Sequence, residues 1–123
     1  MYELIVESDF AAAHCLREYQ GACERLHGHN WRVELVVAGD SLNPLGMVMD
    51  FRDLKAILRE VLDRFEHHFL NDLPDFQKQN PTTENMARVI YEECARRMPA
   101  GVRVRSVGVW ETARAGARYS AGT

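Results

Sequence analysis

Apolar and polar residues alternate along two stretches in the first third of the chain, and this alternation predicts two β-strands. In residues 2–14 the apolar side chains fall mainly on even-numbered positions, and His14 shares that parity. Residues 27–39 alternate more regularly, with His27 and His29 at the start of the series that carries the apolar side chains. Side chains two residues apart project from the same face of a strand, so His14 should share the face of its apolar neighbours, and His27 should share a face with His29.

After Asp50 the spacing of the apolar residues changes to steps of three and four, which is typical of an amphipathic helix. The apolar stripe extends as far as Phe65, and Asp50 is a suitable N-cap for this helix. A second helix is predicted to begin with Thr82 or Thr83 as its cap. Its apolar stripe extends to Met98, where a proline and a glycine follow and end it.

The remaining stretches complete the order of the elements. Residues 47–50 are predicted to be the short end of a returning strand, 71–81 a loop, 102–112 a third long strand and 117–120 a short return. The order strand, strand, helix, helix, strand, strand predicts an α+β fold, an antiparallel four-stranded sheet with both helices on one face. No linker or repeat divides the chain, so residues 1–123 are expected to form one domain. Such a sheet has edges that strand pairing between subunits commonly covers.

The composition is that of an ordinary globular domain, since 46% of the 123 residues are hydrophobic and 27% are charged. The net charge of −3 argues against nucleic acid as a partner, because phosphate binding depends on excess lysine and arginine. No stretch approaches 18 consecutive apolar residues, and the N-terminus carries acids where a signal peptide carries bases. Three cysteines are too few for a disulfide scaffold. We therefore expect a reduced, soluble, cytoplasmic protein with no membrane partner.

The histidines are the main candidates for metal ligands. His27 and His29 stand two residues apart on one strand, which is close enough for two imidazoles to hold one ion. His14 ends the preceding strand, and antiparallel pairing would bring it beside them. Three imidazoles suit Zn²⁺ and leave a fourth position open, as in catalytic zinc sites. The alternative is a closed structural site with Cys23 or Cys15 as the fourth ligand, although the chain has no C-x-x-C pair.

Three further features are candidates for catalysis or binding, and each has a simpler interpretation. Cys23 would lie near the metal and could serve as a thiolate base, or it is an ordinary small residue. Glu66 and His67 pair a carboxylate with an imidazole, or they form a solvated helix end. Glu111 follows apolar residues in a strand and needs a donor array, which either a heterocyclic ligand or an arginine can supply.

Six short motifs in order resemble the 6-pyruvoyltetrahydropterin synthase family. They are "FAAAH", "CERLHGH", "MVMDF", "EHHFLND", "PTTEN" and "VWET", and they span nearly the whole chain. The chain looks most like the bacterial 6-carboxytetrahydropterin synthases of queuosine biosynthesis. The resemblance implies the tunnelling fold, in which trimers stack into hexamers and the sites lie at subunit boundaries.

The resemblance also implies roles for individual residues. Zn²⁺ would be bound by His14, His27 and His29. Cys23 would be the catalytic base, and His67 would be the partner that returns a proton. Glu111, Thr83 and Glu84 would bind the pterin, although helix capping also explains the threonine and the glutamate.

Two departures from the family pattern affect the expected activity. Glu66 stands where the family usually has aspartate, which shifts the carboxylate by one methylene. Glu24 resembles the residue of a subgroup that cleaves dihydroneopterin side chains for folate synthesis. The resemblance implies conversion of 7,8-dihydroneopterin triphosphate to 6-carboxytetrahydropterin. The alternatives are the folate-type cleavage to 6-hydroxymethyl-7,8-dihydropterin, 6-pyruvoyltetrahydropterin synthesis, and a non-catalytic zinc-stabilised assembly protein.

Overall fold

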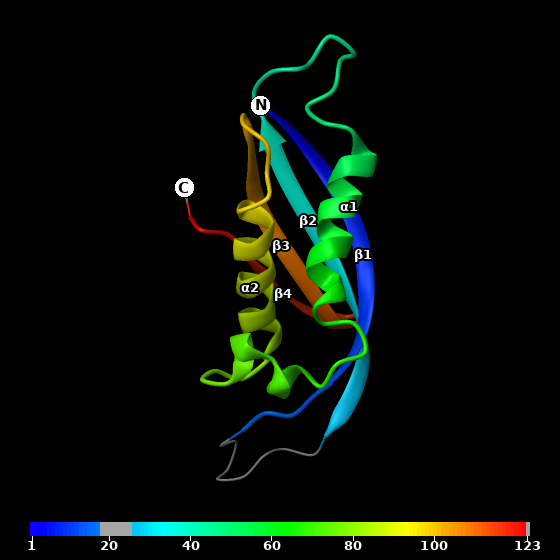
Figure 1. Ribbon diagram of the computed structural model, residues 1–123, viewed down its shortest axis with the longest axis vertical. Coiled ribbons are helices and arrows are strands. Elements are labelled where there is room, and N and C mark those ends of the chain that lie inside the picture. Colours follow the sequence, from blue (N-terminus) through cyan, green and yellow to red (C-terminus); the bar gives the residue numbers. More distant parts are fainter. Residues whose placement is uncertain (18–25, 123) are drawn as a thin grey trace.

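The computed structural model describes residues 1–17 and 26–122, which form a four-stranded antiparallel sheet with both helices on one face (Figure 1). The strands lie in the order β1-β2-β3-β4, so each strand pairs with its neighbours in sequence. The predicted fold class is therefore confirmed. The elements are β1 (Tyr2–His14), β2 (His27–Gly39), α1 (Phe51–Asp63), the 3-10 helices η1 (Leu70–Asp72) and η2 (Pro74–Phe76), α2 (Thr83–Ala95), β3 (Val102–Thr112) and β4 (Ala115–Tyr119).

The two long N-terminal strands have the predicted bounds. They pair along their whole length, from Tyr2 opposite Gly39 to His14 opposite His27. The helices cover one face of the sheet, and the apolar side chains on that face are buried. Phe10 and Trp31 stack there, with ring centroids 6.1 Å apart. The alternation in the sequence thus corresponds to one buried and one more exposed face of the sheet.

Both helices begin where the capping residues predict. The Asp50 carboxylate accepts a hydrogen bond from the backbone N–H of Arg52 at 2.8 Å, and the Thr82 hydroxyl accepts one from Asn85 at 3.1 Å. Each helix ends earlier than its apolar stripe suggests. Phe65 follows the end of α1 and is still buried, since apolar residues beyond a helix can continue to pack against the same core. Within the described chain, neither helix is long and apolar enough to cross a membrane.

The prediction of a returning strand at residues 47–50 is wrong. β1 and β3 already occupy both edges of β2, so no edge of that strand is available for residues 47–50. The segment instead follows a turn in which the Asn43 side chain accepts hydrogen bonds from the backbone N–H groups of Leu45 and Met47, at 2.9 and 3.1 Å.

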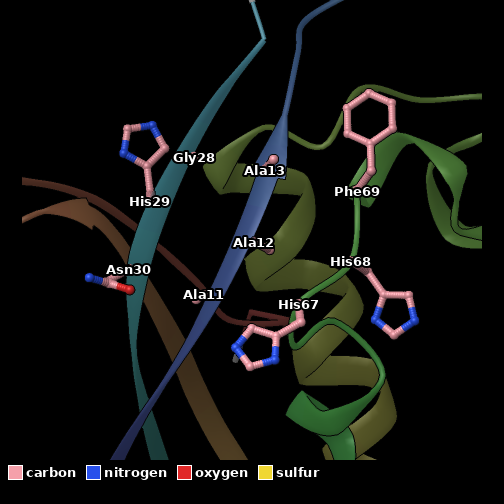
Figure 2. A pocket seen from close by; sticks show the side chains of 9 residues that line it. All are labelled: Ala11, Ala12, Ala13, Gly28, His29, Asn30, His67, His68 and Phe69. Carbon is pink, nitrogen blue, oxygen red and sulfur yellow. The ribbon is translucent and has the colours of Figure 1, made fainter.

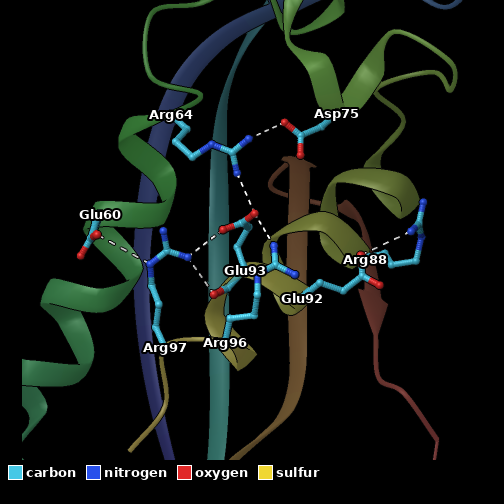
Figure 3. A network of polar contacts seen from close by, with 8 residues as sticks. All are labelled: Glu60, Arg64, Asp75, Arg88, Glu92, Glu93, Arg96 and Arg97. Atoms are coloured by element: carbon cyan, nitrogen blue, oxygen red, sulfur yellow. Dashed lines mark hydrogen bonds and ion pairs between the residues drawn. The ribbon is translucent and has the colours of Figure 1, made fainter.

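The helices are joined by residues 64–82, here called the connecting segment, which contains η1 and η2 in place of the predicted plain loop. Charged side chains hold this segment to α2 (Figure 3). The Arg64 guanidinium bonds the carboxylates of both Asp75 and Glu93, and Glu93 also pairs with Arg96 and Arg97. The network therefore fixes the start of the connecting segment relative to the second helix.

Candidate functional site

The register of the first two strands brings three imidazoles together at one end of the sheet. His14 lies directly opposite His27, and Ala12 lies opposite His29, so the three histidines occupy neighbouring positions on the same face. The ring centroids of His27 and His29 are 4.4 and 5.5 Å from that of His14. The Nε2 atoms of His14 and His27 are 2.8 Å apart. The predicted juxtaposition of these side chains is present in the structure.

His14 is held in one orientation by the segment that precedes α2. Its imidazole is almost fully buried, and its Nδ1 lies 2.8 Å from the carbonyl oxygen of Pro81. A carbonyl only accepts hydrogen bonds, so Nδ1 carries the proton and Nε2 of the neutral ring presents its lone pair to the other two histidines. This is the usual arrangement of an imidazole that binds a metal through Nε2 while its second nitrogen donates to a fixed acceptor.

The fourth member of the cluster is Glu111 of β3. Its Oε1 lies 3.3, 3.8 and 3.1 Å from the Nε2 atoms of His14, His27 and His29. The four side chains form a group whose donor atoms all lie within 4.8 Å of one another. The sequence predicted a vacant position next to the three imidazoles, with an arginine or a heterocyclic ligand as the partner of Glu111. The structure instead brings the carboxylate to the imidazoles.

The chemistry of these four atoms favours a bound cation. His29 Nε2 is buried and finds no hydrogen-bond partner in the part of the chain that the structure describes, although Glu111 Oε1 is close. Burial lowers the pKa of His29 below its ordinary value, against the opposing attraction of the Glu111 carboxylate, so the imidazole favours its neutral form. Lone pairs and a carboxylate that converge on one point repel one another unless a positive ion lies between them.

The separations between the atoms also fit a metal ion. Nitrogen and oxygen ligands about 2.0–2.2 Å from a tetrahedral ion lie about 3.3–3.6 Å from each other. The separation of His14 from His27 is 2.8 Å, and those of Glu111 from the three imidazoles are 3.1–3.8 Å. The group can therefore hold a metal ion with small adjustments of the side chains.

Two asparagines that sequence analysis did not identify continue the ladder beyond β1. The Asn71 side chain accepts from the backbone N–H of Cys15 at 2.9 Å and donates to its carbonyl at 2.8 Å. Asn80 makes the same pair of bonds with Arg17, at 2.8 and 3.0 Å. After His14, the backbone thus bonds to these two side-chain amides in place of the backbone of a neighbouring strand. The sign that Asn71 has a structural role is that its polar side chain is buried, and burial cannot be read from a sequence.

The cysteines differ in their surroundings. Burial raises the pKa of the Cys94 thiol to about 12, so this residue of α2 is not a reactive thiolate. Cys15 is buried just beyond the end of β1. Cys23 and Glu24, the candidate catalytic residues of the "CERLHGH" motif, lie outside the described residues.

Glu66 and His67 form a contact in the connecting segment. His67 Nε2 is 3.2 Å from Glu66 Oε1, and this pairing is possible because α1 has already ended at Asp63. The backbone of His67 has a φ of 59°, in the left-handed region that few residues other than glycine adopt. Its N–H donates to the carbonyl of Ala11 at 2.7 Å, which attaches the segment to the free edge of β1.

The Glu66–His67 pair is not in contact with the histidine cluster within one chain. β1 runs between β2, which carries His29, and the segment that carries His67 (Figure 2). His29 and His67 both line an open depression of about 550 Å³ that extends over β1 from β2 to the connecting segment. The His67 side chain is 78% exposed, so it is available to a ligand or to a second chain.

The other predicted pterin-binding residues lie at the start of α2. Thr83 is half-buried and Glu84 is exposed in the first turn of this helix. They follow Pro81, whose carbonyl accepts a hydrogen bond from His14, so the start of α2 lies beside the histidine cluster. Thr82, not Thr83, caps the helix, which leaves the Thr83 side chain free of that structural task.

Comparisons with known proteins agree with the fold and show the family. Residues 3–122 match the family described as 6-pyruvoyl tetrahydropterin synthase. The 6-carboxy-5,6,7,8-tetrahydropterin synthase of Synechocystis sp. is 40% identical over 125 residues, which cover 97% of this chain and 93% of that protein. The dihydroneopterin monophosphate aldolase of Pyrococcus furiosus is 36% identical over 108 residues, which cover 88% of each chain. The solved structure of Caenorhabditis elegans 6-pyruvoyl tetrahydropterin synthase has a TM-score of 0.85 and 26% identity, over 98% of this chain and 96% of that one.

Proposed function

This chain belongs to the 6-pyruvoyl tetrahydropterin synthase family, and on that premise we propose that it is a 6-carboxytetrahydropterin synthase. The reaction would convert 7,8-dihydroneopterin triphosphate and water to 6-carboxy-5,6,7,8-tetrahydropterin, acetaldehyde and triphosphate. The side chain is oxidised as the pterin ring is reduced, so no external reductant is required. The observation that carries the proposal is the convergence of three imidazoles and Glu111 in a chain 40% identical to a relative of that name.

The metal would be Zn²⁺, held by His14, His27 and His29 through their Nε2 atoms. Neutral imidazoles are the preferred nitrogen ligands of zinc, and the hydrogen bond from His14 to Pro81 already selects the required tautomer. Zinc supplies Lewis acidity towards the hydroxyl groups of the substrate side chain when it is bound.

The remaining steps would be carried out by side chains. The Cys23 thiolate would take a proton from the substrate side chain, and His67, charged by Glu66, would return one. The Glu111 carboxylate would accept hydrogen bonds from the amino-pyrimidine edge of the pterin, as its resemblance to the family's anchoring glutamate implies. Thr83 and Glu84 would contact the same ring from the start of α2.

The exposed position of His67 supports a site shared between subunits. β1 separates His67 from the histidine cluster of its own chain, and the His67 side chain is largely exposed. We infer a homo-oligomer, a hexamer of two trimers, in which the Glu66–His67 pair of one chain serves the metal cluster of another. Such an assembly would also cover the sheet edges that a single chain leaves unpaired.

The test is to incubate the purified, zinc-loaded protein with 7,8-dihydroneopterin triphosphate and identify the product by mass. The assay includes dithiothreitol, so that the cysteines are reduced. We expect 6-carboxytetrahydropterin and acetaldehyde. Cys23→Ala should abolish turnover and keep its zinc, and loss of zinc in that variant would instead make Cys23 a ligand. A product that keeps all three side-chain carbons, now as a pyruvoyl group, would assign 6-pyruvoyltetrahydropterin synthesis, and an unchanged substrate would contradict the proposal.

A second candidate is cleavage of the dihydroneopterin side chain to 6-hydroxymethyl-7,8-dihydropterin. The relative named dihydroneopterin monophosphate aldolase and the presence of Glu24 beside Cys23 favour it. The same mass measurement distinguishes the two products. If both form, Glu24→Gln should remove the hydroxymethyl product alone, whereas loss of both products would show that one set of residues serves both reactions.

A non-catalytic, zinc-stabilised assembly protein is the third alternative. Removal of the metal separates it from an enzyme, because a structural zinc site is required for folding. The hydrophobic core is built from apolar residues of the sheet and both helices, so the metal-free protein should keep its circular dichroism spectrum and lose only activity. Unfolding on chelation would favour the structural alternative.

A further inference from the structure

The outer edge of β1 is bonded by a series of groups from α1 and the connecting segment. The Arg59 guanidinium donates through Nη1 to the carbonyl of Asp9 at 2.9 Å. The N–H of Ala11 donates to Oε2 of Glu66 at 3.3 Å, and the carbonyl of Ala11 accepts from the N–H of His67 at 2.7 Å. Arg59, Glu66 and His67 therefore bond successive backbone groups of one strand edge.

The two oxygens of the Glu66 carboxylate have different partners. Oε1 lies 3.2 Å from Nε2 of His67. Oε2 accepts the bond from Ala11 and lies 3.6 Å from Nη2 of Arg59. A glutamate side chain has many rotamers and loses that freedom only where contacts hold it in place. The contacts of Oε2 therefore determine whether Oε1 stays beside the His67 imidazole.

The Arg59 guanidinium is itself fixed from two sides. Its Nε donates to Oδ1 of Asp63 at 2.9 Å, and its Nη1 also donates to the hydroxyl of Ser8 at 3.1 Å. Because a guanidinium is planar, bonds at Nε and Nη1 also fix the direction of Nη2. Nη2 is buried and makes no hydrogen bond in the described part of the chain, and it forms its ion pair with Glu66. The remaining donors of Arg59 therefore face the Glu66 carboxylate.

We propose that Arg59 is a positioning residue for the Glu66–His67 pair. It holds Oε2 of Glu66 against the edge of β1, so that Oε1 remains in contact with the His67 imidazole. The His67 side chain is largely exposed, so the contact with Glu66 is what orients its ring. The effect of Arg59 on turnover rests on the proposed function, because it requires His67 to transfer a proton in that reaction.

The first experiment measures the placement of the carboxylate without substrate, by hydrogen–deuterium exchange of single amides in the zinc-loaded protein. In Arg59→Ala the N–H of Ala11 should exchange about 3- to 10-fold faster, the factor that one hydrogen bond contributes. The N–H of Ala13 donates to the backbone carbonyl of His68 at 3.3 Å, so its exchange should match the wild type. Glu66→Ala removes the acceptor of Ala11 and gives the upper limit of the effect.

The matched control is Arg52→Ala in the same helix, where the side chain is 91% exposed, and it should change the exchange of neither amide. Faster exchange of Ala11 and Ala13 together in Arg59→Ala would mean that the arginine only docks the connecting segment on β1. Unchanged exchange of Ala11 would mean that the arginine does not hold the carboxylate. Either result would overturn the proposal.

The second experiment measures kcat and KM of the zinc-loaded variants with 7,8-dihydroneopterin triphosphate. Arg59→Ala should lower kcat by about 10-fold and leave KM unchanged, since displacing a catalytic group by about 1 Å can cost about 100-fold. Arg59→Lys keeps the charge and should recover part of the loss. Added to Glu66→Ala, the substitution Arg59→Ala should cause no further loss, because the arginine acts through that carboxylate. The same loss in both backgrounds, or a rise in KM alone, would overturn the proposal.

Circular dichroism and zinc content are measured for every variant, so that a fold defect is not read as lost positioning. If Arg59→Ala fails to fold, Arg59→Lys replaces it in both experiments, because an ammonium cannot bond all the partners of the guanidinium at once. A wild-type protein that forms no product would contradict the proposed function. The exchange of Ala11 relative to Ala13 would then decide by itself whether Arg59 places the Glu66 carboxylate.

Discussion

The histidines of this protein are positioned in two different ways. His14, His27 and His29 lie on the paired strands β1 and β2, where a continuous ladder of backbone hydrogen bonds fixes each position. Glu66 and His67 lie in the connecting segment, which reaches the edge of β1 through two backbone bonds, from His67 to Ala11 and from Ala13 to His68. His14 is buried, and the side chains of His27 and His29 are partly buried, whereas the His67 side chain is largely exposed.

The two groups of side chains depend to different degrees on residues far away in the sequence. In the strands, register alone is sufficient to bring imidazoles together. In the connecting segment, side chains replace the ladder: the amides of Asn71 and Asn80 bond the chain after β1, and the Arg64 ion pairs hold the segment to α2. Apart from the bond between His14 and Pro81, the metal cluster should therefore tolerate changes in the connecting segment better than the Glu66–His67 pair does.

The largest effect should separate the two groups directly. His14→Ala removes a metal ligand and should lower the affinity for Zn²⁺ by about 100-fold or more. His67→Ala should leave the affinity unchanged and lower turnover by about 100- to 10,000-fold, the usual contribution of a proton-transfer group. Chelator competition and steady-state assays on both variants measure the two effects. Loss of metal in His67→Ala would show that the two regions form one unit.

The second effect concerns the amides that support the end of β1. Asn71→Ala leaves the buried N–H and carbonyl of Cys15 without their partners, at a cost of about 2–4 kcal/mol of unfolding free energy. Asn80→Ala removes the same pair of bonds from Arg17, where the site is only partly buried and water can replace them. Urea denaturation should therefore give a loss of about 1 kcal/mol in this matched variant. Equal losses of unfolding free energy in the two variants would mean that burial does not determine how much these hydrogen bonds contribute to stability.

The same contrast explains what the sequence could predict. Local patterns predict part of the structure. Alternation with a period of two gives the bounds of β1 and β2 and the shared face of the three histidines, and the types of the capping residues give Asp50 and Thr82. The partnership of Asn71 with Cys15 joins residues 56 positions apart and has no local pattern. The contact of Glu111 with the imidazoles likewise depends on a bulge, which two residues of one strand and one of the next create together.

The third effect tests the ion pairs that hold the connecting segment to α2. Hydrogen bonds from Arg97 lower the pKa of Glu93, with further help from Arg96 and Arg64. Because the folded pKa lies below the ordinary value of 4.5, the stabilisation is present above that pH and is lost as the pH falls through the folded pKa. Glu93→Gln should lose about 1–2 kcal/mol of unfolding free energy near pH 7, and its deficit should shrink in acid.

The control for this third effect is Glu92→Gln, which removes the exposed carboxylate next in the chain. Glu92 pairs only with Arg88 in the described ion pairs, so its loss should change stability by about 0.5 kcal/mol or less. Urea denaturation across the acid range measures all three proteins. A deficit in Glu93→Gln that stays constant from neutral to acid pH would contradict a role for the charge.

The smallest effect lies in the backbone of His67 itself. Its φ of 59° strains any residue with a Cβ atom, whereas glycine adopts this region freely. His67→Gly and His67→Ala both remove the imidazole, and only the glycine variant relieves the strain. His67→Gly should therefore be more stable than His67→Ala by about 1 kcal/mol in thermal unfolding, after the greater flexibility of unfolded glycine is subtracted. If the alanine variant is the more stable one, the connecting segment does not impose this conformation, and its docking on β1 is looser than the bond from His67 to Ala11 implies.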